Sequence, residues 1–473
     1  MRIALLHYHL KPGGVTSVMG RQAALLADAQ HEVLLIAGAS SPGASWPAPV
    51  AVVPGLAYDR AGQAAPSAAQ TVTDLENALR RHWPDGPPDL IHAHNPILAK
   101  NKRLPNILNG LQRNGHRLLC QVHDFAEDGR PEAYCQDPYP ADCHYAVVNG
   151  RDRHLLQAAG LSDGGVHYLP NAIDPITLPA EIPGGSAGPV LYPVRAIRRK
   201  NIGEAILLRL FMQTAAPLAI TLPPQSGGDM DGYRLWRKTV ADQGLPVMFE
   251  AGCRADFRRL LAQCRFALTT SITEGFGFAF LEPWCAGKAL WGRLLPDICN
   301  DFSRKGIFLD HLYRQLRVPL DWLDASILQQ QWCNAWLAAA ECYGLTSDVD
   351  IAHQGWTTIS ADGWIDFGLL NELHQHTILA RVIADPHAKR LLADRNLFLR
   401  APGPPSPAAA LIDGNRRAVL RHFHPAGHLQ RLLAIYHQVM AHPVRQAIDK
   451  RKLAAAFLTP ERFSLLKWRP FHG

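Results

Sequence analysis

The chain has 473 residues, of which 47% are hydrophobic and 19% are charged, and its formal net charge at pH 7 is +7. This composition allows a large buried core and excludes a wholly disordered chain, while the length favours two domains. No stretch of about 18 apolar residues occurs, so the sequence predicts no membrane-spanning helix.

The first half of the chain alternates short apolar runs with amphipathic segments. The run at residues 3–6 predicts a buried strand, and a turn with two glycines follows before apolar residues recur at helical spacing. This alternation predicts a parallel sheet that is covered by helices on both faces. Further strands are predicted at residues 33–37, 90–92, 118–122, 145–148 and 167–169.

A proline- and glycine-rich segment at residues 175–189 predicts a linker between two domains. The expected architecture is α/β, with one doubly wound, Rossmann-like domain at residues 1–180 and a second at residues 187–473. Ligands of such sheets bind beyond the carboxyl ends of the strands, so we expect a cleft where the two halves face each other. The strands predicted in the second half are at residues 190–194, 218–222, 247–249, 266–269 and 289–291.

The C-terminal region departs from this alternation. Residues 320–345 and 374–391 have a helical pattern, which predicts a helical insertion at about residues 301–400. Two closing helices are predicted after residue 413, as part of the second domain.

Glu274 and Glu282 straddle a glycine-rich turn that follows the strand predicted at residues 266–269. Glycine lets the backbone approach a ligand closely, and the free N–H groups of a helix start suit a phosphate. Pro283 supports a helix start here, because proline is tolerated near the first turn. A carboxylate beside a phosphate site is suited to accept hydrogen bonds from sugar hydroxyls. The turn itself consists of Gly275, Phe276 and Gly277.

The order of these features resembles family 4 of the retaining glycosyltransferases with the GT-B fold. Its EX7E motif matches Glu274 and Glu282, and the resemblance implies that the first holds hydroxyls of the donor sugar and the second holds the nucleotide ribose. Arg195 and Lys200 match two cations that bind the donor pyrophosphate in this family. Fixed cations of this kind stabilise a leaving diphosphate. A solvated basic turn is the alternative interpretation of the pair. The resemblance also assigns the turn residues Gly275, Phe276 and Gly277 to donor binding.

Features of the N-terminal half extend the resemblance. Gly13 and Gly14 match a glycine loop that lies near the donor diphosphate or the acceptor, although an ordinary turn would have the same residues. His123 ends the strand predicted at residues 118–122, where the family often carries a histidine near the donor sugar. We assign catalytic roles to two residues, His123 and Glu274.

His92 and His94 end a neighbouring strand, and we expect them to point to opposite faces, so that one of them faces the cleft. His94 and Asp124 are assigned to the acceptor side. A metal site would need further ligands, and none is spaced nearby, so no metal is expected.

The resemblance implies a retaining hexosyltransferase that moves a hexose from a nucleoside diphosphate sugar to a hydroxyl of a small polar molecule or a saccharide. Arg195, Lys200 and the helix N-terminus would replace a divalent cation, so no cofactor is expected. The mild positive charge does not require nucleic acid as a partner. Nine scattered cysteines without a CxxC pair are typical of reduced thiols, and we expect a cytoplasmic protein.

Two alternatives stay open at this stage. The first is a membrane-peripheral enzyme that acts on a lipid or a lipid-linked glycan, which the basic and aromatic tail at residues 467–471 would allow. The second is a non-catalytic module of the same fold that binds a sugar nucleotide or a protein. The retention of both glutamates and both cations favours an enzyme.

Overall fold

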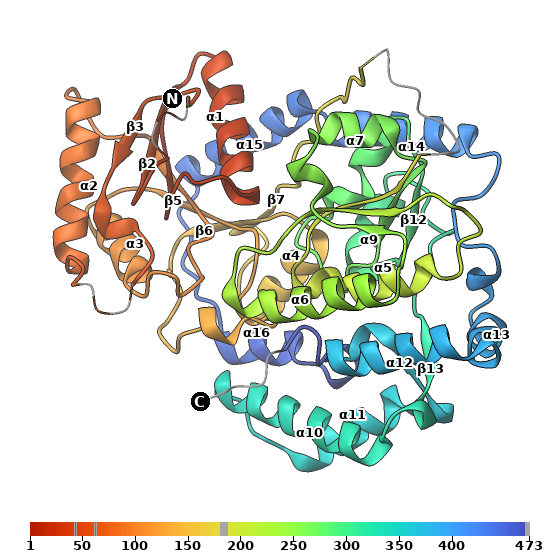
Figure 1. The fold of residues 1–473 in the computed structure, drawn as a ribbon. Helices are drawn as coiled ribbons and strands as arrows, with labels where there is room; N and C mark the ends of the chain where they lie inside the picture. The colour runs from red at the N-terminus through yellow and green to blue at the C-terminus, as the bar shows by residue number, and fades with distance from the viewer. Residues whose placement is uncertain (42, 44, 61, 63, 180–187, 469–473) are drawn as a thin grey trace. The chain divides into compact units, whose positions relative to one another are not determined.

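The computed structural model describes residues 1–468 except residues 42, 44, 61, 63 and 180–187, so part of the predicted linker and the tail at 469–473 lie outside the described residues. The chain divides into two compact units. Unit 1 comprises Met1–Ala172, Cys342–Leu345 and Phe423–Leu458. Unit 2 comprises Ile173–Glu341, Thr346–His422 and Thr459–Gly473. Figure 1 shows the elements of both units.

Unit 1 is built on a seven-stranded parallel sheet with the order β3-β2-β1-β4-β5-β6-β7. The apolar runs that predicted strands form most of this sheet, because both faces are covered and the strands need no polar side. The short β3 was not predicted, since its apolar run has only three residues and none of them is fully buried. The strands are β1 (Arg2–His7), β2 (Glu32–Ala37), β3 (Val50–Val52), β4 (Leu90–His94), β5 (Leu118–Val122), β6 (His144–Val147) and β7 (Val166–Tyr168).

Helices cover both faces of this sheet. Leu79 of α2 and Ile107 of α3 belong to the core on one face, whereas Met19 of α1 belongs to the core on the other face. The helices that precede residue 172 are α1 (Gly14–Asp28), α2 (Ala68–His82), α3 (Leu104–Arg113) and α4 (Gly150–Ala158).

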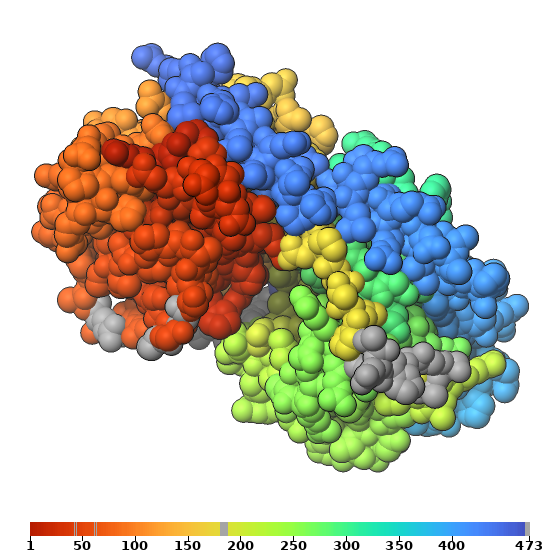
Figure 2. Space-filling view, turned by 90° about the horizontal axis from the view of Figure 1, so that it is seen from above, coloured from red at the N-terminus to blue at the C-terminus, as the bar shows by residue number. Residues whose placement is uncertain are grey.

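Two C-terminal helices, α15 (Pro425–Ala441) and α16 (Lys450–Phe457), also belong to unit 1. Leu432 and Tyr436 of α15 are fully buried in the same core as Met19 of α1. Figure 2 shows the blue C-terminal segment lying against the red N-terminal part of this unit. The prediction placed all closing helices in the second domain. The structure differs because the apolar face of α15 completes the cover of the first sheet.

Unit 2 contains a five-stranded parallel sheet with the order β10-β9-β8-β11-β12. This second sheet confirms the predicted pair of doubly wound α/β halves. Its strands are β8 (Val190–Arg195), β9 (Leu218–Leu222), β10 (Val247–Met248), β11 (Phe266–Thr269) and β12 (Leu290–Gly292). The accompanying helices are α5 (Ile202–Arg209), α6 (Gly227–Asp242), α7 (Phe257–Gln263), α8 (Glu282–Cys285), α9 (Pro296–Ser303) and α14 (Ala409–Phe423).

The helical insertion predicted at about residues 301–400 is present, together with a short antiparallel pair of strands. The helix expected at residues 374–391 is divided, because Asp385 caps a new helix whose first residue is Pro386. None of the described helices is long and apolar enough to cross a bilayer. The elements are α10 (Ala325–Cys342), α11 (Val349–Ile359), α12 (Glu372–Ala384), α13 (Pro386–Arg395), β13 (Arg317–Pro319) and β14 (Trp364–Asp366).

Candidate active site

Four of the predicted donor-binding side chains line one pocket of unit 2, which has a volume of about 180 Å³. Arg195 is the last residue of β8, Lys200 ends the 3-10 turn η3 (Arg198–Lys200), and both glutamates follow β11. Parallel strands present their carboxyl ends at one edge of the sheet, which brings these distant positions together. The four polar residues are Arg195, Lys200, Glu274 and Glu282, and the remaining wall consists of Pro193, Val194, Phe257, Leu261, Phe278, Ala279 and Pro283.

Lys200 and Glu274 form an ion pair inside this pocket. The Nζ–Oε1 distance is 2.5 Å, and the two side chains are only 14% and 9% exposed. Burial favours the neutral Glu274 carboxyl, but the charges of Lys200 and Arg199 outweigh burial and hold its pKa below the ordinary value. Glu274 is therefore a carboxylate at neutral pH, and it compensates the charge of Lys200.

The backbone that carries the two cations is anchored to the strands on either side. The Tyr192 hydroxyl donates to the main-chain oxygen of Lys200 at 2.5 Å, and the Thr270 hydroxyl donates to the same oxygen at 3.2 Å. The Arg195 guanidinium donates to the carbonyl of Pro223 at 3.0 Å. These contacts fix the course of the turn between β8 and α5.

The glycine-rich turn before Glu282 is shaped by packing within unit 2. Gly277 has a φ of 89°, and a Cβ there would lie 3.0 Å from the Phe280 ring, so glycine is required at this position. The Phe276 ring is buried and packs edge-on against Phe302, with ring centroids 6.0 Å apart. Gly277 and Phe276, which the sequence assigns to donor binding, therefore pack against other residues of unit 2. Gly275, Phe276 and Gly277 are not part of the pocket wall.

The helix expected directly after Gly277 is shorter than predicted. The 3-10 turn η5 (Phe278–Phe280) comes first, and the four-residue helix α8 then begins at Glu282. Pro283 lies in its first turn, as predicted. Glu282 thus stands at the start of α8, where a carboxylate interacts favourably with the free N–H groups.

In unit 1, the structure brings His94 and His123 together at the ends of β4 and β5. His94 Nδ1 lies 3.1 Å from His123 Nε2, and the two rings are nearly parallel. The rings of His92 and His94 also stack, with centroids 4.3 Å apart. The expectation that these two side chains point to opposite faces is therefore wrong, because side chains two positions apart in a strand share a face.

These histidines are neutral at neutral pH. Burial lowers the pKa of His92 to about 3 and that of His123 to about 4, and it also holds the pKa of His94 well below its ordinary value. Asp124, beside His123, pairs with the guanidinium of Arg130 at 2.8 Å. Unit 1 therefore offers uncharged imidazoles at this edge of its sheet, beside an internally compensated carboxylate.

Gly13 and Gly14 lie exposed at the start of α1. Gly13 has extended backbone with a φ of 177°, which any residue adopts. A Cβ on Gly14 would meet no atom within 4 Å, and the nearest atom to a Cβ on Gly13 would be a carbonyl oxygen of Lys11 at 3.9 Å. No contact within the described chain requires glycine here, and the side of the loop that a Cβ would occupy is open.

Sequence reasoning missed two residues of the unit 2 site. Arg199 contributes to the lowered pKa of Glu274, but nothing in the sequence connected this neighbour of Lys200 with Glu274. Phe257 lines the pocket and is 39% exposed. A single aromatic residue at a helix start carries no recognisable signal. Among the described residues, no group of three or more His, Cys, Asp or Glu side chains is arranged to hold a metal ion.

Comparison with known proteins gives matches in both halves of the fold. The family model for the glycosyl transferase 4-like domain matches residues 13–164. A curated relative, mannosylglucosyl-3-phosphoglycerate synthase of Petrotoga mobilis, is 27% identical over 242 residues, which is 45% of this chain and 47% of the relative. The chain thus aligns with about half the length of that relative.

Solved structures share the architecture over nearly the whole chain. The Anabaena protein HepE in complex with UDP and glucose has a TM-score of 0.54 and is 14% identical, and the match covers 92% of this chain and 98% of HepE. Sucrose-phosphate synthase from Thermosynechococcus elongatus has a TM-score of 0.52 at 14% identity, with 93% and 99% covered. A glycosyltransferase from Rickettsia africae has a TM-score of 0.55 at 11% identity, with the same shares covered. Residues 13–164 thus match a glycosyl transferase 4-like domain, and the chain as a whole shares the GT-B fold of these structures.

Proposed function

We propose that the chain is a glycosyltransferase that moves a hexose from a nucleoside diphosphate sugar to an acceptor hydroxyl. One observation carries the proposal: two cations, Arg195 and Lys200, and two carboxylates, Glu274 and Glu282, line a single pocket of unit 2. The likeness to a glycosyltransferase from Rickettsia africae supports it, and another similar structure, HepE, was solved with UDP and glucose.

The pocket offers a separate partner for each part of such a donor. Arg195 and Lys200 are suited to the diphosphate, because charge-assisted hydrogen bonds to phosphate oxygens are strong. Glu282 is suited to the ribose hydroxyls and Glu274 to hydroxyls of the transferred sugar. The exposed ring of Phe257 provides a flat apolar surface on which a nucleobase can stack.

The ion pair between Lys200 and Glu274 is compatible with both roles. Without a donor, each charge compensates the other, so neither is left buried and unpaired. A bound diphosphate supplies a further anion to Lys200, and sugar hydroxyls supply hydrogen-bond donors to Glu274. The donor would thus add partners to a charge pair that is already in place.

In the proposed reaction the hexose keeps its anomeric configuration. The bond from the anomeric carbon to the diphosphate oxygen breaks, and its electron pair leaves with the diphosphate, where Arg195 and Lys200 stabilise the added charge. The acceptor oxygen forms the new bond on the same face and transfers its proton to a phosphate oxygen. We propose that these cations serve in place of a divalent metal.

The acceptor is proposed to be a saccharide or another small polar molecule, and the name of the curated relative supports a saccharide. His123, which is neutral and keeps a little exposed surface, would contribute hydrogen bonds on the acceptor side, and the fully buried His94 would orient the His123 ring. A lipid acceptor has less support, because Trp468 of the described tail is only 4% exposed and stacks on Phe463. All nine cysteines are free thiols, which supports the proposed cytoplasmic location.

A donor panel tests the proposal. UDP-, GDP- and ADP-linked hexoses are incubated with candidate acceptors in the presence of a chelator, release of the nucleoside diphosphate is measured, and NMR gives the anomeric configuration of the product. Lys200→Ala is the control, and it should weaken diphosphate binding by about 1.5–3 kcal/mol. Binding without turnover would favour the non-catalytic module. Inversion, or activity that requires added metal, would refute the proposed mechanism.

A further inference from the structure

We propose that helix α12 of the insertion is a positioning element for Lys200, and that Glu372 and Gln375 are the residues through which it acts. The inference rests on the proposed function, in which Lys200 meets the donor diphosphate. It assigns a role to part of the insertion at residues 301–400, which the sequence left without one.

Glu372 binds Arg198, which lies in the turn that carries Lys200 (residues 195–201). The Arg198 guanidinium donates to both oxygens of Glu372, at 2.7 and 2.9 Å, and each side chain is 14% exposed. The same guanidinium donates to the carbonyl of Leu465 at 3.1 Å, and the Arg198 backbone N–H donates to Asp229. Arg198 is thus fixed by the insertion and by the C-terminal segment, and its charge is directed away from the donor pocket.

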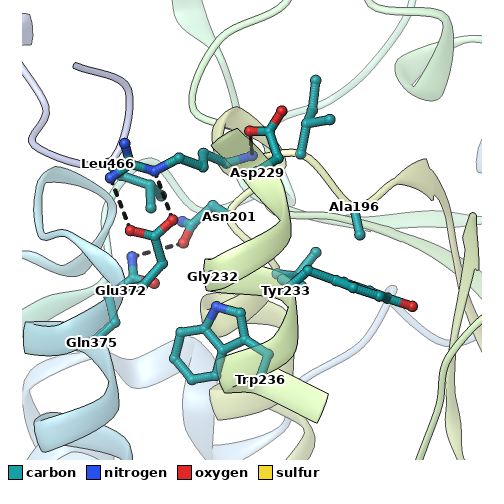
Figure 3. A pocket seen from close by; sticks show the side chains of 12 residues that line it. Ala196, Asn201, Asp229, Gly232, Tyr233, Trp236, Glu372, Gln375 and Leu466 are labelled. Carbon is teal, nitrogen blue, oxygen red and sulfur yellow. Dashed lines mark hydrogen bonds and ion pairs between the residues drawn. The ribbon is translucent and has the colours of Figure 1, made fainter. Parts of the chain in front are cut away.

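Gln375 holds the other end of the same turn. Asn201 has left-handed backbone, with φ 51° and ψ 52°, which asparagine adopts more readily than most residues when its short side chain forms hydrogen bonds. The fully buried Gln375 donates to the Asn201 amide oxygen at 2.9 Å, and the Asn201 amide donates to Glu204 at 2.7 Å. Figure 3 shows Glu372 and Gln375 pointing from α12 toward this turn.

Two glycines allow α12 to approach so closely. A Cβ on Gly232 of α6 would lie 2.7 Å from a carboxylate oxygen of Glu372, and a Cβ on Gly203 of α5 would lie 2.5 Å from the side chain of Gln375. The cavity that remains among these residues has a volume of only about 10 Å³. That is close to the smallest space that holds one water molecule, so this region is packed and is not a ligand site.

Lys200 therefore lies between two anchored residues, Arg198 and Asn201, in a single 3-10 turn. A shift of either anchor moves the Lys200 backbone, and with it the Nζ that pairs with Glu274 at 2.5 Å in the pocket wall. Small displacements of a charged group that binds a ligand have large effects on binding. The contacts of α12 consequently affect the binding of the donor's phosphates and not the binding of its nucleoside.

A double-mutant cycle tests the proposal. Glu372→Gln should weaken the binding of UDP or GDP, measured by calorimetry, by on the order of tenfold, and leave the binding of uridine or guanosine unchanged. In a Lys200→Ala background, Glu372→Gln should have no further effect on diphosphate binding. An equal effect of Glu372→Gln in both backgrounds, or an equal loss of nucleoside binding, overturns the positioning role.

Two further variants keep the test decisive. Asp362→Asn breaks exposed ion pairs of Asp362 with Arg317 and Arg395 in the same insertion, and it should leave diphosphate binding unchanged. If Glu372→Gln unfolds, Arg198→Lys removes the two-pronged contact while keeping the charge, and the same cycle is run with it. If Lys200→Ala alone leaves UDP and GDP binding unchanged, the proposed donor site fails. If only the Glu372 and Arg198 variants are without effect, the positioning role alone fails.

Discussion

The buried histidines of unit 1 predict that this unit loses stability in mild acid. Burial lowers the pKa of His7 and His92 to about 3 and that of His123 and His428 to about 4. In the unfolded chain each of these groups titrates near 6.5. Below that pH the unfolded state binds protons that the folded state rejects, so stability falls as the pH drops from about 6.5 toward 4.

The magnitude follows from this pKa difference. At pH 5.5 an unfolded histidine is about 90% protonated, while each folded one is still almost entirely neutral. The free energy of unfolding then falls by about 1.4 kcal/mol for each group. Four groups together lower it by about 5 kcal/mol, which is comparable to the total stability of a small domain.

Amide hydrogen exchange at pH 7.5 and pH 5.5 measures this effect separately for each unit. After correction for the pH dependence of intrinsic exchange, the opening free energy of β4 and β5 should fall by several kcal/mol. His428→Gln is the matched variant, because an amide can also donate to the Pro170 carbonyl and accept from Gln22, as His428 does. It should reduce the pH effect by about 1.4 kcal/mol. Equal opening free energies at the two pH values, in the parent protein, would refute the reasoning.

Four further predictions concern unit 2. Glu274→Gln should lower kcat by about 10²-fold or more while UDP or GDP binding is kept, because its carboxylate acts beside the reacting sugar; a change in KM alone would contradict this. Glu282→Gln should raise KM by about tenfold with little change in kcat, since the ribose does not react, and steady-state kinetics on the two variants show whether the roles divide in this way. Phe257→Ala should weaken the binding of nucleotides with any base by about 1–3 kcal/mol. Inorganic pyrophosphate has no base to stack, so calorimetry should show that its affinity is unchanged. Arg293→Met leaves two buried carboxylates uncompensated and should lower the free energy of unfolding by about 3–5 kcal/mol in denaturant titration; an unchanged midpoint would exclude this role.

The sheets and the unit 2 pocket could be predicted because their signals are local. Strands buried on both faces are continuous apolar runs, and β5, β9 and β11 begin and end where the sequence predicts. Arg195 ends β8, Lys200 and Glu274 follow β8 and β11 within five residues, and Glu282 begins α8, the helix that comes after β11. Since parallel strands end at one edge of a sheet, a motif at each strand end is enough to predict a common site.

The remaining features depend on contacts that are distant in the sequence. The apolar positions of α15 do not reveal which sheet they cover, so the helix was placed in the wrong half. The run at residues 198–200 consists of three basic residues, yet their partners differ. Arg198 forms an ion pair with Glu372, and Lys200 forms one with Glu274. The resemblance selected Lys200 for the pocket, whereas the contact of Arg198 with Glu372 is seen only in the folded chain.

The pocket of unit 2 and the paired histidines of unit 1 differ in charge, and the proposed chemistry accounts for the difference. Unit 2 keeps full charges in its pocket by pairing Lys200 with Glu274, and fixed charges are what a departing diphosphate requires. Unit 1 instead keeps His94 and His123 neutral at the ends of β4 and β5. A cation beside an acceptor hydroxyl would draw electron density from the attacking oxygen, whereas a neutral imidazole can orient that hydroxyl through a hydrogen bond. Burial of these histidines therefore suits the proposed nucleophile, which needs orientation without added positive charge, and the predicted acid sensitivity of unit 1 would be the cost in stability of keeping them neutral.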